Sequence, residues 1–124
     1  MANVTIEING KEYAFNINVN TSELYYQTFN EDLIELSMKS KDDNTILVRR
    51  NRIAKLAYIT NMQTKKTVRE LCGHLSVSLY LEWAEQFEPG VFLGDAGLKL
   101  MEAWRESLGV KAEEKNPDSP QLEE

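Results

Sequence analysis

The strongest constraint on the fold is a turn dipeptide between two runs of strict alternation. Apolar and polar residues alternate over residues 4–8 and again over 13–19, on either side of Asn9-Gly10. Asn-Gly between such runs indicates a β-hairpin with a type I′ turn, because both central residues of that turn need a positive φ. We therefore expect a hairpin over residues 4–19.

A two-residue loop at this turn sets the register of the two strands. It predicts three cross-strand pairs, which are Ile8 with Lys11, Ile6 with Tyr13, and Val4 with Phe15. Cross-strand partners share a face, so the apolar side chains all fall on one side. An isolated hairpin is marginal in water, so this face is expected to pack on other elements.

The rest of the chain up to residue 108 reads as helical. Helices are predicted over about 22–39, 45–63, 67–87 and 95–108. The first follows a capping cluster at residues 20–23, and Asn30 is a candidate break within it. The second is apolar nearly all round, which is typical of a central, buried helix.

Local signals also mark the ends of the later helices. Thr67 and Glu70 have the spacing of a capping box, and Gly73 predicts a break before a fresh helix that runs to Phe87. Gly109 is the expected residue just beyond the last helix. One hairpin followed by about four helices is an α+β fold that is mainly α.

Length and composition limit what such a chain can be. Its 124 residues predict a single globular domain over residues 1–110. Residues 111–124 hold two prolines, five acids and one leucine, so we expect a disordered acidic tail there. One Cys and one His exclude an internal disulfide and the usual zinc clusters, and we expect no metal and no cofactor.

The sequence also indicates the cellular location of the protein and whether its surface suits a phosphate backbone. The N-terminus lacks the basic and apolar regions of a signal peptide, and no stretch is long and apolar enough for a membrane span. We therefore expect a cytoplasmic protein that does not enter membranes. The net charge of −6 argues against wrapping a phosphate backbone with the surface as a whole.

No set of residues in the sequence indicates a reaction. Cys72 and His74 are two apart, which places them on different faces of a helix. The carboxylate pairs at residues 31–32 and 42–43 are explained by capping and solvation, and the glycine-containing stretch 89–97 lacks the order of a phosphate-binding loop. We expect a protein that is not an enzyme and has no small-molecule substrate.

Two groups of side chains have both a structural and a binding interpretation. Arg49, Arg52 and Lys55 form one stripe, with Arg50 beside it, which is either a phosphate-binding surface or a helix face balanced by the acids at 31–43. The second group is apolar and includes Trp104, and it supplies either core or partner surface. Its candidate partner-binding residues are Trp83, Phe87, Val91 and Phe92.

The order of sequence blocks resembles a known family. The Asn-Gly hairpin is followed by three blocks, which are Thr21-Ser22-Glu23-Leu24-Tyr25-Tyr26, residues 52–59 (RIAKLAYI) and residues 80–89 (YLEWAEQFEP). A helix with Trp104 and a charged tail end the chain. This pattern, over residues 1–110, resembles the tail assembly chaperones of long-tailed phages and prophages of Gram-positive bacteria.

The resemblance implies a non-enzymatic protein that is absent from the finished virion. Such chaperones bind the aggregation-prone tape measure protein in the host cytoplasm during tail assembly. A longer form is often made by a −1 ribosomal frameshift, and Glu114-Lys115-Asn116 can be encoded by a slippery GAA-AAA-AAC sequence. Self-association is also expected, since a hairpin exposes edges that can pair between copies.

Two other functions remain open at this point. One is a small acidic adaptor or regulator that binds a protein unrelated to tails. The other is a nucleic-acid-binding protein that uses the stripe from Arg49 to Lys55, which the negative net charge makes the less favoured of the two.

Overall fold

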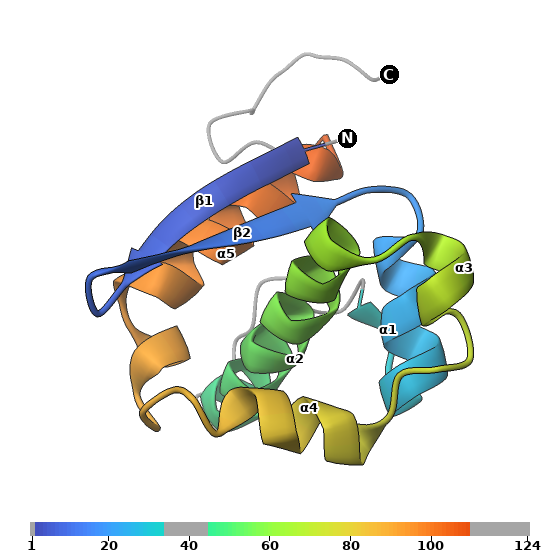
Figure 1. Cartoon of the computed structure of the whole chain (residues 1–124). Coiled ribbons are helices and arrows are strands. Elements are labelled where there is room, and N and C mark those ends of the chain that lie inside the picture. Colours follow the sequence, from blue (N-terminus) through green and yellow to red (C-terminus); the bar gives the residue numbers. More distant parts are fainter. Residues whose placement is uncertain (1, 34–44, 110–124) are drawn as a thin grey trace.

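The computed structural model describes residues 2–33 and 45–109 of the chain. The first element of its fold is an N-terminal β-hairpin. Strands β1 (Ala2–Ile8) and β2 (Lys11–Ile17) pair in an antiparallel two-stranded sheet (Figure 1). The three predicted cross-strand pairs are all present. Asn9 and Gly10 have φ of 54° and 81°, as the predicted turn requires.

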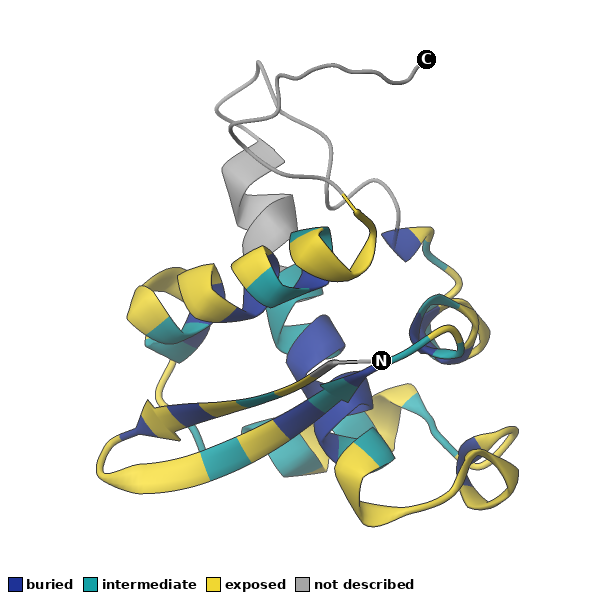
Figure 2. Ribbon diagram, turned by 90° about the horizontal axis from the view of Figure 1, so that it is seen from above, coloured by how far each residue is buried: buried dark blue, intermediate teal, exposed yellow. Residues whose placement is uncertain are grey.

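One face of the hairpin is buried, as the alternation predicts. Ile6 and Ile8 of β1 and Phe15 and Ile17 of β2 are all at most 6% exposed. Figure 2 shows the resulting alternation of buried and exposed residues along the strands. Helix α2 (Thr45–Lys65) packs along β2 and helix α5 (Asp95–Ser107) packs along β1, so the two helices cover this apolar face.

Helix α1 (Thr21–Phe29) is shorter than the predicted helix over 22–39. Asn30 ends it by adopting a left-handed conformation with φ of 57°, from which its N–H donates to the carbonyl of Tyr26. The chain then turns, and Leu33 is buried in the core. The prediction was thus wrong for residues 30–33, and the remainder of that predicted helix lies outside the described residues.

The polar cluster before α1 does not cap it in the predicted way. Asn20 is the N-cap residue, but its side chain makes no capping hydrogen bond. Instead, Thr21 Oγ1 accepts from the N–H of Asn18 at 3.0 Å and donates to Gln63 Oε1 at 2.7 Å. Gln63 Nε2 donates in turn to Asn18 Oδ1 at 2.9 Å. These side chains therefore join the hairpin, α1 and α2, which is a long-range role.

Helix α2 is the central element, as its all-round apolar sequence predicts. It covers the whole of the predicted range 45–63 and ends two residues later. Residues 56–61 are all buried, and the Thr60 hydroxyl donates a hydrogen bond to the carbonyl of Leu56. The hairpin, α1, α4 and α5 are grouped around it (Figure 1).

The predicted helix over 67–87 is two helices, α3 (Val68–Leu71) and α4 (Val77–Ala84). The capping box at the start of α3 is present, with Thr67 and Glu70 satisfying each other's backbone N–H groups. Gly73 has φ of 79°, which confirms the predicted break. Helix α4 ends at Ala84, so the expected continuation to Phe87 was wrong.

The last two elements of the described residues are a short 3-10 helix, η2 (Val91–Leu93), and helix α5. Helix α5 ends one residue before the predicted boundary, and Gly109 follows it with φ of 80°. Its buried face holds Gly97, Leu100, Met101 and Trp104. The described residues thus form the predicted α+β fold, with an N-terminal hairpin followed by helices.

Candidate functional site

A groove lies between α2, α3 and α4, and we call it the α2–α4 groove. Its volume is about 370 Å³, within the range of small binding pockets. Six of its lining residues are mainly apolar and form the floor, namely Tyr58, Met62, Leu71, Leu75, Leu79 and Trp83. Four are charged or titratable and form the rim, namely Lys66, Glu70, His74 and Glu82.

The floor is built by residues one helical turn apart on two helices. Tyr58 and Met62 are four residues apart on α2, and Leu79 and Trp83 are four apart on α4. Each pair therefore lies on one side of its helix. Leu79 remains 42% exposed, so the floor keeps apolar surface in contact with solvent.

Trp83 is the one predicted partner-binding residue that lines the groove. Its ring contacts the rings of Tyr58 and Phe87, with centroid distances of 5.5 and 4.9 Å, and stacks on Phe92 at 6.3 Å. Phe92 is only 8% exposed, and Phe87 and Val91 are half-buried against the core. The structure thus brings these four candidates together in or against the core, and only Trp83 also lines the groove.

Asn61 fixes the indole of Trp83 in this position. It is 3% exposed, and its Oδ1 accepts a hydrogen bond from Trp83 Nε1 at 3.0 Å. Its Nδ2 donates to the carbonyl of Ala14 on β2 at 2.8 Å. One buried amide on α2 therefore connects the groove floor to the edge of the hairpin.

The remaining floor residues were not singled out by the sequence. Met62, Leu75 and Leu79 each occur in an apolar pattern that is equally consistent with burial in the core. The available signal was the width of the apolar surface of residues 53–62, which exceeds what one buried face needs. That surface covers both the core and the groove, so pattern alone does not separate the two.

The rim places charge beside the apolar floor. Burial raises the pKa of the Tyr58 hydroxyl, and the nearby carboxylate of Glu82 raises it further. Tyr58 therefore stays protonated at neutral pH, so the floor itself is uncharged. Cys72 and His74 are both exposed, and the Cys72 thiol contacts Gln27 Oε1 at 3.5 Å.

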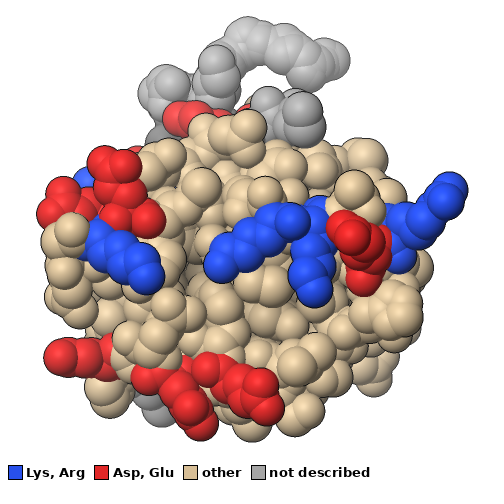
Figure 3. All heavy atoms as spheres, viewed as in Figure 1, with Lys and Arg blue, Asp and Glu red and all other residues tan. Residues whose placement is uncertain are grey.

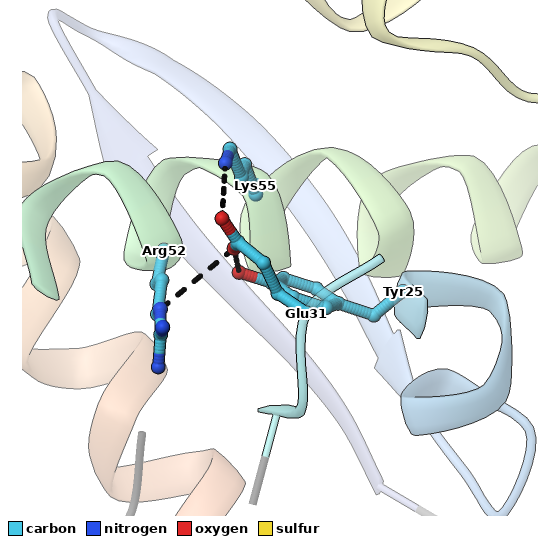
Figure 4. A network of polar contacts seen from close by, with 4 residues as sticks. All are labelled: Tyr25, Glu31, Arg52 and Lys55. Atoms are coloured by element: carbon cyan, nitrogen blue, oxygen red, sulfur yellow. Dashed lines mark hydrogen bonds and ion pairs between the residues drawn. The ribbon is translucent and has the colours of Figure 1, made fainter. Parts of the chain in front are cut away.

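Two cations of the predicted basic stripe are engaged by one carboxylate. Glu31 lies 3.1 Å from Lys55 Nζ and 3.7 Å from Arg52 Nε, and it accepts a hydrogen bond from the Tyr25 hydroxyl at 3.1 Å (Figure 4). This arrangement supports the interpretation of the stripe as a balanced helix face. The side chains of Arg49 and Arg50, and the acids at 42–43, lie outside the described part.

The same cluster shifts the titration of Tyr25. Burial and the negative charge of Glu31 both raise the pKa of the Tyr25 hydroxyl far above its usual range. Lys55 also lies 5.0 Å from the centre of the Phe29 ring. Glu31 therefore ties the segment after α1 to the middle of α2.

A second cavity, of about 670 Å³, lies where the end of β2 meets the end of α5. Its walls include Ile17, Val19, Trp104 and Leu108. Among the described residues, the buried Trp104 Nε1 has no hydrogen-bond partner, and Val19 is 88% exposed. This cavity is lined by Trp104 of the predicted apolar group, but by none of the four candidate partner-binding residues Trp83, Phe87, Val91 and Phe92.

Comparisons with known proteins, family models and solved structures find no match to this chain. Within residues 2–33 and 45–109, no group of three or more His, Cys, Asp or Glu side chains is placed to hold a metal ion. In the same residues, no helix combines the length and apolar character needed to cross a lipid bilayer.

Proposed function

We propose that this protein is a phage tail assembly chaperone that binds the tape measure protein and keeps it soluble while the tail is built. The observation that supports this proposal is the α2–α4 groove, with its apolar floor and charged rim. A groove of this kind accepts an amphipathic helix, whose apolar residues recur at i, i+3, i+4 and i+7. A long helical client offers many such segments.

The dimensions of the groove suit a temporary complex. A volume of about 370 Å³ holds only a few side chains, so a single groove gives moderate affinity. A client that binds several copies of the chaperone gains avidity, yet each contact still opens quickly. Weak, repeated binding protects an aggregation-prone client and permits release on assembly, without any catalytic step.

The rest of the proposal follows from the same role. The protein acts in the cytoplasm of the bacterial host, where the tape measure protein is made, and copies of it associate with one another. The gene is expected between those of the major tail protein and the tape measure protein. The frameshift hypothesis at Glu114-Lys115-Asn116 falls outside the described residues and is tested by the DNA sequence of those codons.

Co-expression with the neighbouring tape measure protein tests the function directly. We expect the client to become soluble and to co-purify with the chaperone. The variant Leu79→Gln, which makes the groove floor polar, is expected to reduce recovery of the client. Leu98→Gln is the matched control, because Leu98 is also an exposed helical leucine but does not line the groove.

Two outcomes contradict the proposal. If the client stays insoluble and nothing co-purifies, the protein is not its chaperone. If Leu79→Gln and Leu98→Gln reduce client recovery equally, the groove is not the binding site. Recovery of an unrelated helical protein through the same groove, with the tape measure protein left insoluble, would instead identify an acidic adaptor or regulator.

A further inference from the structure

The charges beside the α2–α4 groove are separated by sign. Lys66 of the rim directly follows α2, which ends at the exposed Lys65, and the exposed Arg69 follows three residues later in α3. On the opposite side, Glu82 of the rim belongs to α4, and the exposed Glu85 follows at its C-terminus. Among the described residues, none of these five side chains forms an ion pair.

The space-filling view shows the same separation on the surface. In Figure 3, Lys and Arg side chains cross the middle of the face, with some carboxylates beside them at the right and the upper left, and a further group of carboxylates follows the lower edge, where Figure 1 places α4. Uncharged surface lies between the two bands. An occupant of the groove would therefore have positive charge along one flank and negative charge along the other.

Glu70 is the exception on the basic side, and its carboxylate is already engaged. Its Oε1 accepts hydrogen bonds from the backbone N–H of Thr67 at 2.9 Å and from the Thr67 hydroxyl at 3.3 Å. This capping box holds the carboxylate at the start of α3, where it compensates the N-terminal dipole of that helix. Lys66 thus remains the rim cation available to a partner.

We propose that the α2–α4 groove binds an amphipathic helix in one chain direction, with an acidic flank against Lys66 and a basic flank against Glu82. The inference rests on the proposed function, since it specifies the client segment that the chaperone recognises. That segment has an apolar stripe with carboxylates along one side and Lys or Arg along the other.

Direction follows from the geometry of a helix on a surface. A helix that keeps its apolar stripe on the floor and is turned end for end exchanges its left and right flanks. With oppositely charged rims, one direction pairs opposite charges on both sides, and the other direction opposes like charges on both sides. An exposed ion pair changes affinity about 1.5- to 5-fold, so two flanks favour one direction by roughly 2- to 25-fold.

Synthetic peptides test this preference on the full-length protein. The first is a helix of about 20 residues with leucines along one stripe, Glu along one flank and Lys along the other. The second has the two flanks exchanged. A nitroxide on Cys72, the only cysteine, reports which end of a bound peptide is near, because Cys72 follows the floor residue Leu71.

We expect each peptide, labelled with a fluorophore at one end or the other, to be quenched more strongly from one end. The preferred end should reverse between the two peptides. It should reverse again in the double variant Lys66→Glu/Glu82→Lys, which preserves net charge. The control Lys11→Glu/Glu12→Lys exchanges charges on exposed hairpin residues and should leave the preference unchanged.

The failures of the two proposals are distinguishable. Peptides that bind the groove but are quenched equally from both ends overturn the directional inference and leave the chaperone proposal standing. A preference that persists in Lys66→Glu/Glu82→Lys, with its fold verified by circular dichroism, also overturns the inference. If neither peptide binds and the tape measure protein does not co-purify, both proposals are wrong.

Discussion

Trp83 and Asn61 are joined by a hydrogen bond of 3.0 Å between the indole Nε1 and the amide Oδ1. The two residues lie on different helices, and Asn61 also donates to the carbonyl of Ala14. A single amide therefore satisfies a donor on the groove floor and an acceptor on the hairpin edge. Because the Asn61 amide is buried, removing it would leave Trp83 Nε1 and the Ala14 carbonyl without this partner, which costs free energy of folding.

Substitution Asn61→Ala should lower the free energy of unfolding by about 2–4 kcal/mol, because two partly buried polar groups lose their partner. Chemical denaturation gives this value. Asn3→Ala, at an exposed strand position, is the control and should change stability by less than about 0.5 kcal/mol. Equal effects of the two substitutions would mean that Asn61 does not bridge α4 and β2.

Gly97 is expected to tolerate no side chain. A Cβ atom at this position would overlap the carbonyl group of Phe92, so Gly97→Ala must separate α5 from η2. We expect a loss of about 1–3 kcal/mol or more, measured by thermal or denaturant unfolding. Gly90→Ala is the matched control, because a Cβ there meets no atom within 4 Å and φ is −94°. A stable Gly97→Ala protein would contradict this packing.

Glu31→Gln should destabilise the protein by about 1–2 kcal/mol, because it removes the charge that holds Lys55 and Arg52. The difference from the unsubstituted protein should shrink as salt screens the ion pairs. The exposed Glu7→Gln is the control for loss of one negative charge. A salt-independent difference would show that packing of Glu31, not its charge, stabilises the fold.

Stability should fall at alkaline pH because of three tyrosines, of which Tyr25 and Tyr58 are buried and Tyr80 is half-buried. The pKa values of Tyr25, Tyr58 and Tyr80 are all raised in the folded protein, chiefly by burial. Above the unfolded-state value of about 10, the unfolded chain loses these protons first, so it is favoured as pH rises. Below that pH the contribution to stability is fully present.

The size of this alkaline effect is testable for one residue. Tyr25 alone should lower the free energy of unfolding by about 1.4 kcal/mol for each pH unit above 10. Unfolding measured from neutral pH to above pH 10 should therefore show a shallower decline in Tyr25→Phe than in the unsubstituted protein. An identical decline in both proteins would mean that Tyr25 titrates normally.

Several features of the fold were predictable because they depend on neighbours in the chain. The hairpin register followed from a two-residue turn and the side-chain period of a strand, and both are local. The capping box of Thr67 and Glu70 and the break at Gly73 are likewise properties of short segments. The sequence alone therefore determined the hairpin and most of the helix boundaries.

Some residues were compatible with two local conformations or hydrogen-bond partners, and tertiary packing determined which one formed. Asn30 was compatible with a helix through it or with a left-handed end, and the burial of Leu33 accompanies the second. Thr21 was compatible with a capping role, but its hydroxyl instead donates to Gln63, which is 42 residues away. A side chain with several possible partners takes the one that the fold brings near.

The groove was decided only by the tertiary structure. Trp83 was a candidate from its residue type, but its companions Met62, Leu75 and Leu79 share an apolar pattern with the core. Periodicity shows that a helix has an apolar face, and it does not show whether a neighbour covers all of that face. Here α2 has more apolar surface than the hairpin, α1 and α5 cover. Helices α3 and α4 border the remainder, which lines the α2–α4 groove.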